Sequence, residues 1–160
     1  MAPDISVLMV CLGNICRSPV AEGVFRHMTI EAGHGDVIET DSVGLMGWHT
    51  GAPPDERSIE AAARRGVDLS GLRARKLSAA DFERFDLLLA MDRGHFRDMA
   101  ARAPGEHAAK VRMFMEAAHG DGAPSVPDPY YGAHDGFEQV LDMIEEGSRA
   151  WLRELEENWL

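Results

Sequence analysis

The sequence contains little that would anchor the chain in a membrane or hold it together through disulfides. Only two of its 160 residues are cysteines, Cys11 and Cys16, and both lie in one short stretch, so no disulfide framework is expected. No apolar run approaches the length of a bilayer span, and the first residues lack the basic and apolar pattern of a signal peptide. These absences predict a protein of the reducing cytoplasm.

Positive charge is scarce as well. Lys and Arg number 16 against 27 Asp and Glu, which gives a formal net charge of −11. This balance argues against a nucleic-acid partner, and it means that a bound anion must be held by a local pocket. The 7 histidines show no ligand spacing such as His-x3-His, so no metal and no cofactor is expected.

The most informative feature present is an arginine that follows a cysteine after five intervening residues. Cys11 ends an apolar run at residues 5–10, and Arg17 opens a segment of helical character. A loop that leads from a strand into a helix N-terminus points its N–H groups inward and favours negative charge. That field favours the nucleophilic thiolate form of Cys11, and the planar fork of Arg17 can hold two phosphate oxygens. The spacing therefore predicts a phosphate cradle with a nucleophile at its base.

The residues between and after this pair suit such a loop. Gly13 permits close approach of the backbone, and Asn14 tolerates the left-handed region. Ser18 can donate its hydroxyl hydrogen to the Cys11 sulfur and help it to leave.

A second candidate segment reads Pro-Asp-Pro-Tyr-Tyr-Gly at residues 127–132. Cleavage of a phosphate ester expels an alkoxide or phenoxide, which leaves more easily when an acid protonates it. Asp128 is the candidate acid, and Tyr130 and Tyr131 are candidates to line a slot for an aromatic group. Taken alone, the segment is more typical of a turn with two packing tyrosines.

Together these segments resemble the low-molecular-weight protein tyrosine phosphatase family over nearly the whole chain. The matching segments are residues 10–19, 41–42, 47–49, 68–71, 73–75, 91–92 and 128–132. The resemblance implies that Cys11 is the nucleophile, that Arg17 binds phosphate, and that Asp128 acts first as acid and then as base. It also implies a substrate-binding set and two supporting residues. The substrate-binding set is Leu12, Gly13, Asn14, Ile15, Cys16, Ser18, Trp48, Tyr130 and Tyr131. The supporting residues are Ser42 and Asp92, and Asp92 would hold Arg17. The implied partners are phosphotyrosine proteins, with a cognate tyrosine kinase as a candidate.

Two positions in the resemblance need separate comment. Leu72 stands where many members carry a histidine that supports Asn14, which leaves the support of Asn14 an open question. Cys16 would form a reversible disulfide that shields Cys11 from over-oxidation, and the alternative is a small packing residue.

The pattern of apolar residues predicts the fold. Strands are expected at residues 5–10, 37–40, 86–91 and 111–115, and helices at 18–31, 55–65, 78–85, 93–102 and 136–159. This alternation predicts a single α/β domain over residues 1–160. We expect a four-stranded parallel sheet with helices on both faces, a Rossmann-like or flavodoxin-like three-layer sandwich. Cys11, Ser42 and Asp92 fall at or near strand ends, where such folds bind ligands.

Three other activities share parts of this pattern. A protein-arginine phosphatase tends, within the family, to carry threonine between the Asn and Cys of the loop, where this chain has Ile15. An arsenate reductase would need further cysteines to resolve its adduct, and the chain has none beyond Cys16. A phosphate-binding module without catalysis is disfavoured because Cys11, Arg17 and Asp128 are all present.

Overall fold

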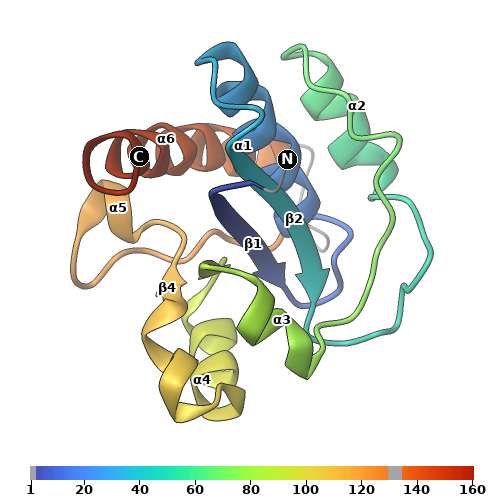
Figure 1. Cartoon of the computed structure of the whole chain (residues 1–160). Helices are drawn as coiled ribbons and strands as arrows, with labels where there is room; N and C mark the ends of the chain where they lie inside the picture. Colours follow the sequence, from blue (N-terminus) through green and yellow to red (C-terminus); the bar gives the residue numbers. More distant parts are fainter. Residues whose placement is uncertain (1–2, 130–134) are drawn as a thin grey trace.

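The computed structural model describes residues 3–129 and 135–160, which form a parallel four-stranded sheet flanked by helices (Figure 1). The strands are β1 (Ile5–Cys11), β2 (Ile38–Gly44), β3 (Leu87–Ala90) and β4 (Val111–Met113). The helices are α1 (Arg17–Glu31), α2 (Glu56–Ala63), α3 (Ala79–Arg84), α4 (Arg93–Arg102), α5 (Glu116–His119) and α6 (Asp135–Asn158). The predicted α/β fold is confirmed, and each predicted strand and helix is present, although β2 runs on to Gly44 rather than ending at residue 40.

Alternate residues of β1 enter two separate cores, one on each face of the sheet. Val7 and Met9 belong to a core that includes Phe25 of α1 and Trp151 of α6. Leu8 and Val10 belong to a second core with residues of α3 and α4. Because successive side chains of a strand point to opposite faces, β1 is buried on both sides and forms the middle layer. Figure 1 shows α1, α2 and α6 on one side of the sheet and α3 and α4 on the other.

The strand order is β2-β1-β3-β4, and all three strand pairs are parallel. The connections therefore reverse direction between β1 and β3, and ligands bind in the crevice at the carboxyl ends of such a pair. Cys11 ends β1, and Asp92 follows the end of β3. The fold places these two residues at the same edge of the sheet.

Two short elements were not expected from the sequence. These are a 3-10 helix, Gly105–Lys110, and the four-residue helix α5. Neither element buries any residue. The sequence of each therefore lacks the apolar periodicity from which helices are predicted. Within the described ranges, no helix combines the length and apolar character needed to cross a bilayer.

Candidate active site

The loop at residues 12–16 connects β1 to α1 and is held in one conformation by its neighbours. Asn14 has φ of 59°, and it is the one non-glycine residue with positive φ in the described ranges. Asparagine adopts this left-handed conformation more easily than most residues. Gly44, at the end of β2, lies directly beneath the loop, because a Cβ there would be 2.9 Å from the Leu12 carbonyl oxygen. The end of β2 therefore forms the floor of the loop.

The Cys11 sulfur lies against a hydroxyl group. Cys11 Sγ and Ser18 Oγ are 2.9 Å apart, and both side chains are buried. Ser18 Oγ also accepts a hydrogen bond of 2.9 Å from Asn14 Nδ2. Since Asn14 supplies the hydrogen of that bond, the hydrogen of Ser18 itself can go to the sulfur or to the Val43 carbonyl oxygen, which is further away at 3.4 Å. This arrangement stabilises a thiolate, which can only accept.

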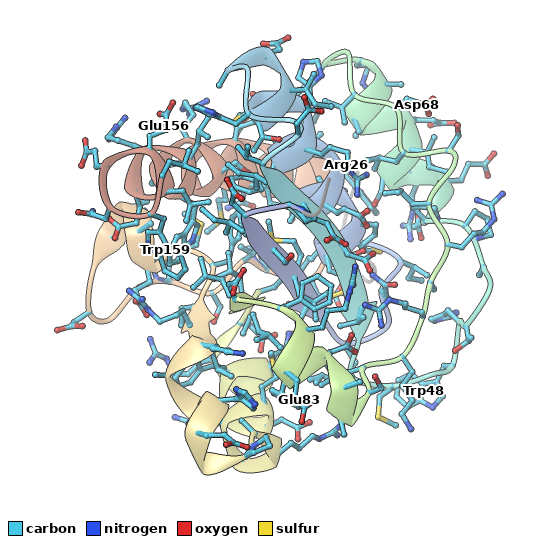
Figure 2. All side chains as sticks on the ribbon, in the orientation of Figure 1. Arg26, Trp48, Asp68, Glu83, Glu156 and Trp159 are labelled. Atoms are coloured by element: carbon cyan, nitrogen blue, oxygen red, sulfur yellow. The ribbon has the colours of Figure 1, made fainter. Side chains whose placement is uncertain are left out.

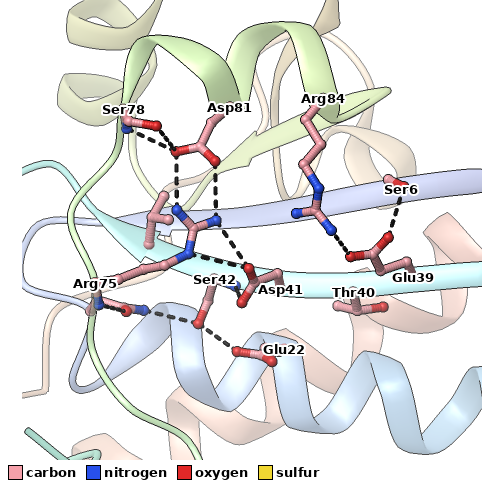
Figure 3. A network of polar contacts seen from close by, with 12 residues as sticks. Ser6, Glu22, Glu39, Thr40, Asp41, Ser42, Arg75, Ser78, Asp81 and Arg84 are labelled. Atoms are coloured by element: carbon pink, nitrogen blue, oxygen red, sulfur yellow. Dashed lines mark hydrogen bonds and ion pairs between the residues drawn. The ribbon is translucent and has the colours of Figure 1, made fainter. Parts of the chain in front are cut away.

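The same amide group reaches a buried carboxylate on the other side. Asn14 Nδ2 donates to Ser42 Oγ at 2.9 Å, and Ser42 Oγ lies 2.6 Å from Glu22 Oε1, to which it donates. Glu22 is 4% exposed and also pairs with Arg26, four residues further along α1. Burial raises the pKa of Glu22, and the contacts with Ser42 and Arg26 oppose that rise. Figure 3 shows the Ser42 side chain beside Glu22, with the guanidinium of Arg75 on the opposite side of β2.

The carbonyl oxygen of the Asn14 amide is bound by a main-chain group. Asn14 Oδ1 accepts a hydrogen bond of 3.0 Å from the backbone N–H of Arg75. This contact answers the question raised by Leu72, whose side chain packs against the hydrophobic core. The amide is supported by a group that every residue except proline carries, so the loop network does not need a histidine at position 72.

Arg17 is buried at the start of α1 and is held by two other segments. Its guanidinium donates to Asp92 Oδ2 at 2.9 Å and to the Val126 carbonyl oxygen at 3.0 Å. Asp92 Oδ1 accepts the backbone N–H of His95 at 2.8 Å and so caps α4. Burial alone would raise the pKa of Asp92, but its contacts with His95 and Arg17 outweigh burial and hold that pKa below its usual range. Asp92 is therefore a carboxylate that fixes the arginine.

These segments enclose a pocket of about 70 Å³. Its lining residues are Cys11, Leu12, Gly13, Ile15, Cys16, Arg17, Trp48, His49 and Asp128. The three candidate catalytic residues therefore meet in one cavity, although Asp128 is far from the other two in sequence. Asp128 Oδ2 lies 3.5 Å from an Arg17 nitrogen. Trp48 is 67% exposed and lies on the loop after β2, at the edge of the molecule (Figure 2).

The other predicted site residues fall into two groups. Asn14, Ser18, Ser42 and Asp92 are not among the lining residues. Ser18 and Asp92 contact Cys11 and Arg17, which do line the pocket, and Ser42 is linked through Asn14 to Ser18. Tyr130 and Tyr131 lie outside the described residues, so their placement around the substrate stays a prediction.

Cys16 lines the pocket beside Cys11 but has a different character. Burial raises the pKa of the Cys16 thiol to about 12, and the charge of Asp55 adds to this rise. Both cysteines are free thiols. At neutral pH Cys16 is therefore a neutral thiol, and it does not compete with Cys11 as a nucleophile.

The roles of four contributors to the site, Glu22, Arg75, Val126 and His49, were not identified from the sequence. Glu22 left one usable signal, because it lies four residues after Ser18 and so on the same face of a predicted helix. Arg75 lies in the matching segment at residues 73–75, but the contacts that Arg75 and Val126 make here left no signal, because each contributes a main-chain atom. His49, which lines the pocket, was noted only as part of a matching segment.

Comparison with known proteins agrees with this geometry. The family model for low molecular weight phosphotyrosine protein phosphatase matches residues 6–159. The chain belongs to this family. A low molecular weight protein-tyrosine-phosphatase of Streptomyces coelicolor is 45% identical over 154 residues, which cover 94% of this chain and 93% of the relative.

Solved structures of this phosphatase family superimpose on the chain over nearly its full length. A protein tyrosine phosphatase from Entamoeba histolytica, with Hepes in its active site, has a TM-score of 0.92 and 32% identity. It covers 98% of this chain and 99% of its own. YwlE of Bacillus subtilis, described as an arginine phosphatase, has a TM-score of 0.87 and 27% identity, and covers 97% and 98% of the two chains.

Proposed function

We propose that the protein hydrolyses phosphotyrosine in proteins through a cysteinyl-phosphate intermediate. The observation that carries this proposal is the meeting of Cys11, Arg17 and Asp128 in one small pocket. A nucleophile, a cation for the phosphate and an acid are the three groups that such a reaction requires. The membership of the chain in a phosphotyrosine phosphatase family supports the same reaction.

In the first step the Cys11 thiolate attacks phosphorus and the bond to the tyrosine oxygen breaks. Asp128 gives its proton to that oxygen, so that tyrosine leaves as a neutral phenol. Arg17 and the N–H groups of the loop stabilise the equatorial oxygens of the transferring group. Asp92 and the Val126 carbonyl hold Arg17 in place for this task.

In the second step water attacks the phosphorus of the cysteinyl phosphate. Asp128, now a carboxylate, accepts a proton from that water, and the Cys11 thiolate leaves. Ser18 donates to the departing sulfur, and the distance of 2.9 Å between Ser18 Oγ and Cys11 Sγ supports this role.

Selectivity for an aryl phosphate follows from the pocket walls. Leu12, Ile15 and Trp48 give the lining an apolar part, and an aromatic ring would be packed between them while its phosphate reaches the thiolate. The shorter side chain of phosphoserine would leave its phosphate away from the loop. Tyr130 and Tyr131 are proposed to complete this wall.

The two alternatives are less well supported. The likeness to YwlE favours protein-arginine phosphatase as the second candidate, and Ile15 and the paired tyrosines favour tyrosine. Arsenate reduction would require a cascade of cysteines, and the whole chain has two.

We further propose that the protein works in the cytoplasm, where both thiols stay reduced, and that a tyrosine kinase supplies its substrates. Under oxidative stress, Cys16 would protect Cys11 by forming a disulfide.

The test is a comparison of phosphotyrosyl, phosphoseryl and phosphoarginyl peptides of one sequence, with wild type and Cys11→Ser. Turnover of the phosphotyrosyl peptide alone, abolished by the substitution, is the expected result. Preference for phosphoarginine would replace the proposal by its second candidate. If phosphate binds but no peptide is hydrolysed, the protein is a binding module. Melting curves of both proteins check that the substitution leaves the fold intact.

A further inference from the structure

The orientation of the Asn14 amide decides whether the Ser18 hydroxyl can donate its hydrogen to the Cys11 sulfur. In the present orientation the Nδ2 group donates to Ser18 and Ser42, and the oxygen accepts from Arg75. If the amide were rotated by half a turn, its oxygen would face Ser18. The hydroxyl hydrogen of Ser18 would then go to that oxygen instead of to Cys11.

The backbone N–H of Arg75 therefore helps to fix the orientation of the Asn14 amide, and β2 holds the Arg75 backbone in place. The Arg75 carbonyl oxygen accepts the N–H of Gly44 at 2.9 Å, and the Gly44 carbonyl oxygen accepts the N–H of Leu77 at 2.8 Å. Gly44 is also the residue beneath the phosphate loop. The segment with Arg75 thus lies along the end of β2, next to the loop.

The side chain of Arg75 fixes the same segment from its other side. Its guanidinium makes two hydrogen bonds to Asp41 of β2, at 3.0 and 3.2 Å, and two to Asp81 of α3, at 3.1 and 3.2 Å. Asp81 is 4% exposed and also accepts the N–H of Ser78 at 2.8 Å. Figure 3 shows Arg75 between the two carboxylates. A planar fork with four bonds to two elements is held far more rigidly than a single ion pair.

We propose that Arg75 is a positioning residue for catalysis, which acts through its backbone N–H on Asn14 and from there on Ser18 and Cys11. Asp41 and Asp81 fix the guanidinium of Arg75. The guanidinium in turn fixes the position of the Arg75 backbone N–H relative to the Asn14 side-chain oxygen. The proposal rests on the role of Cys11 under the proposed function. It predicts an effect on the reactivity of the sulfur and little effect on the phosphate contact of Arg17.

The chain offers a matched control on the same strand. Arg84 of α3 pairs with Glu39 of β2, as Figure 3 shows, and this pair has no bond to the Asn14 network. Arg75→Met and Arg84→Met each remove one guanidinium that joins α3 to β2, but only the first removes the proposed support of Asn14. Arg75→Lys keeps the charge and loses the planar fork.

The experiment measures alkylation of Cys11 by iodoacetate against pH, with mass spectrometry to locate the label, and kcat and KM for a phosphotyrosyl peptide. For Arg75→Met we expect the alkylation profile to move to higher pH, with roughly 3- to 10-fold slower alkylation at about pH 6. We expect a similar fall in kcat and a KM changed by less than about twofold. Arg84→Met is expected to stay within about twofold of wild type in all three quantities, and Arg75→Lys to recover part of the loss.

Unchanged alkylation and kcat in Arg75→Met would overturn the proposal, and so would equal losses in both methionine variants, because these would reflect stability alone. If Arg75→Met does not fold, Asp41→Asn removes one of the two anchoring charges with little change in shape and is expected to move the alkylation profile in the same direction. An unmoved profile in that variant would overturn the proposal too. If wild type hydrolyses no phosphoester and the alkylation profile still moves, the proposed function fails while the positioning role stands.

Discussion

Ser18 Oγ and Cys11 Sγ lie 2.9 Å apart at the junction of β1 and α1. The contact joins the last residue of the strand to the second residue of the helix. Because Asn14 donates to the same hydroxyl oxygen, the Ser18 hydrogen is left for the sulfur at 2.9 Å or the Val43 carbonyl oxygen at 3.4 Å, and the sulfur is the nearer of the two. The strand, the loop and the helix therefore meet at one polarised hydroxyl group.

Ser18→Ala removes this donor and is expected to slow the departure of the thiolate from the cysteinyl phosphate. A hydrogen bond to a charged group is worth about 1.5–3 kcal/mol, which corresponds to a loss of roughly 10- to 100-fold in kcat. Rapid-quench measurement should show the phosphoenzyme accumulating in the variant. An unchanged kcat with no accumulation would contradict the role of Ser18.

Asp128→Asn keeps the size of the side chain but removes its ability to give a proton to the leaving group and to accept one from water. We expect kcat for a phosphotyrosyl peptide to fall by roughly 100- to 10,000-fold, as for other general acids. The loss should be smaller for p-nitrophenyl phosphate, whose leaving group needs less protonation.

The pH profile tests the same residue independently. Attack requires Cys11 without its proton and Asp128 with one, so wild type should give a bell-shaped profile with a mildly acidic optimum. Asp128→Asn should lose the basic limb. A wild-type rate that keeps rising into alkaline solution would be incompatible with Asp128 as the acid.

Peroxide treatment tests the protective role of Cys16. Oxidation converts the Cys11 thiolate to a sulfenic acid, and attack by Cys16 then forms the disulfide and releases water. Because burial raises the pKa of Cys16 to about 12, this step should speed up as the solution becomes more alkaline. Dithiothreitol should restore wild-type activity after peroxide, whereas Cys16→Ser should lose that recovery. Equal recovery of the two proteins would end the proposal.

Glu22 should make the stability of the protein depend on pH. Its pKa is raised by burial in the folded state from an ordinary value of 4.5, so the folded state binds more protons than the unfolded state above that value. The free energy of unfolding should therefore fall as pH rises through the window from 4.5 to the raised value. A tenfold difference in proton affinity between the folded and unfolded states corresponds to about 1.4 kcal/mol.

Urea unfolding at several pH values checks this expectation, with Glu22→Gln as the comparison. The variant should lose the decline with pH that wild type shows in this window. Glu31→Gln, an exposed position on the same helix, controls for the loss of a carboxylate from α1. If the free energies of unfolding of wild type and Glu22→Gln change with pH in parallel, burial of the Glu22 carboxylate has no net cost in stability.

Much of the site was predictable because its chemistry depends on residue types at short spacing. The spacing of Cys11 and Arg17, the apolar run before them and the helix after them predicted a loop at the end of a strand, and the structure has that loop. The family resemblance implied that Asp92 holds Arg17, and the two side chains form an ion pair of 2.9 Å. Strands β1 and β3 were predictable because each carries a buried apolar run, whereas the polar residues Asp41 and Ser42 hid the full extent of β2.

The contacts that set the geometry of the loop were not predictable in the same way. The family pattern drew attention to Leu72, but the support of Asn14 comes from the backbone of Arg75. Arg17 is held in part by the Val126 carbonyl oxygen, 109 positions further along the chain. No residue type signals a contact made by a main-chain atom, because nearly every residue has the same atoms.

By itself, the sequence determined which groups are present and which elements carry them. Its apolar periodicity fixed an alternation of strands and helices, and its local spacing fixed a thiol, an arginine and a turn between them. Only the tertiary structure decided which distant groups share the site. It brought Asp128 into the pocket of Cys11, buried Glu22 behind Ser42, and set Arg75 between two carboxylates. These relations depend on how the layers pack against one another, and local propensities carry no information about the distance between residues far apart in the chain.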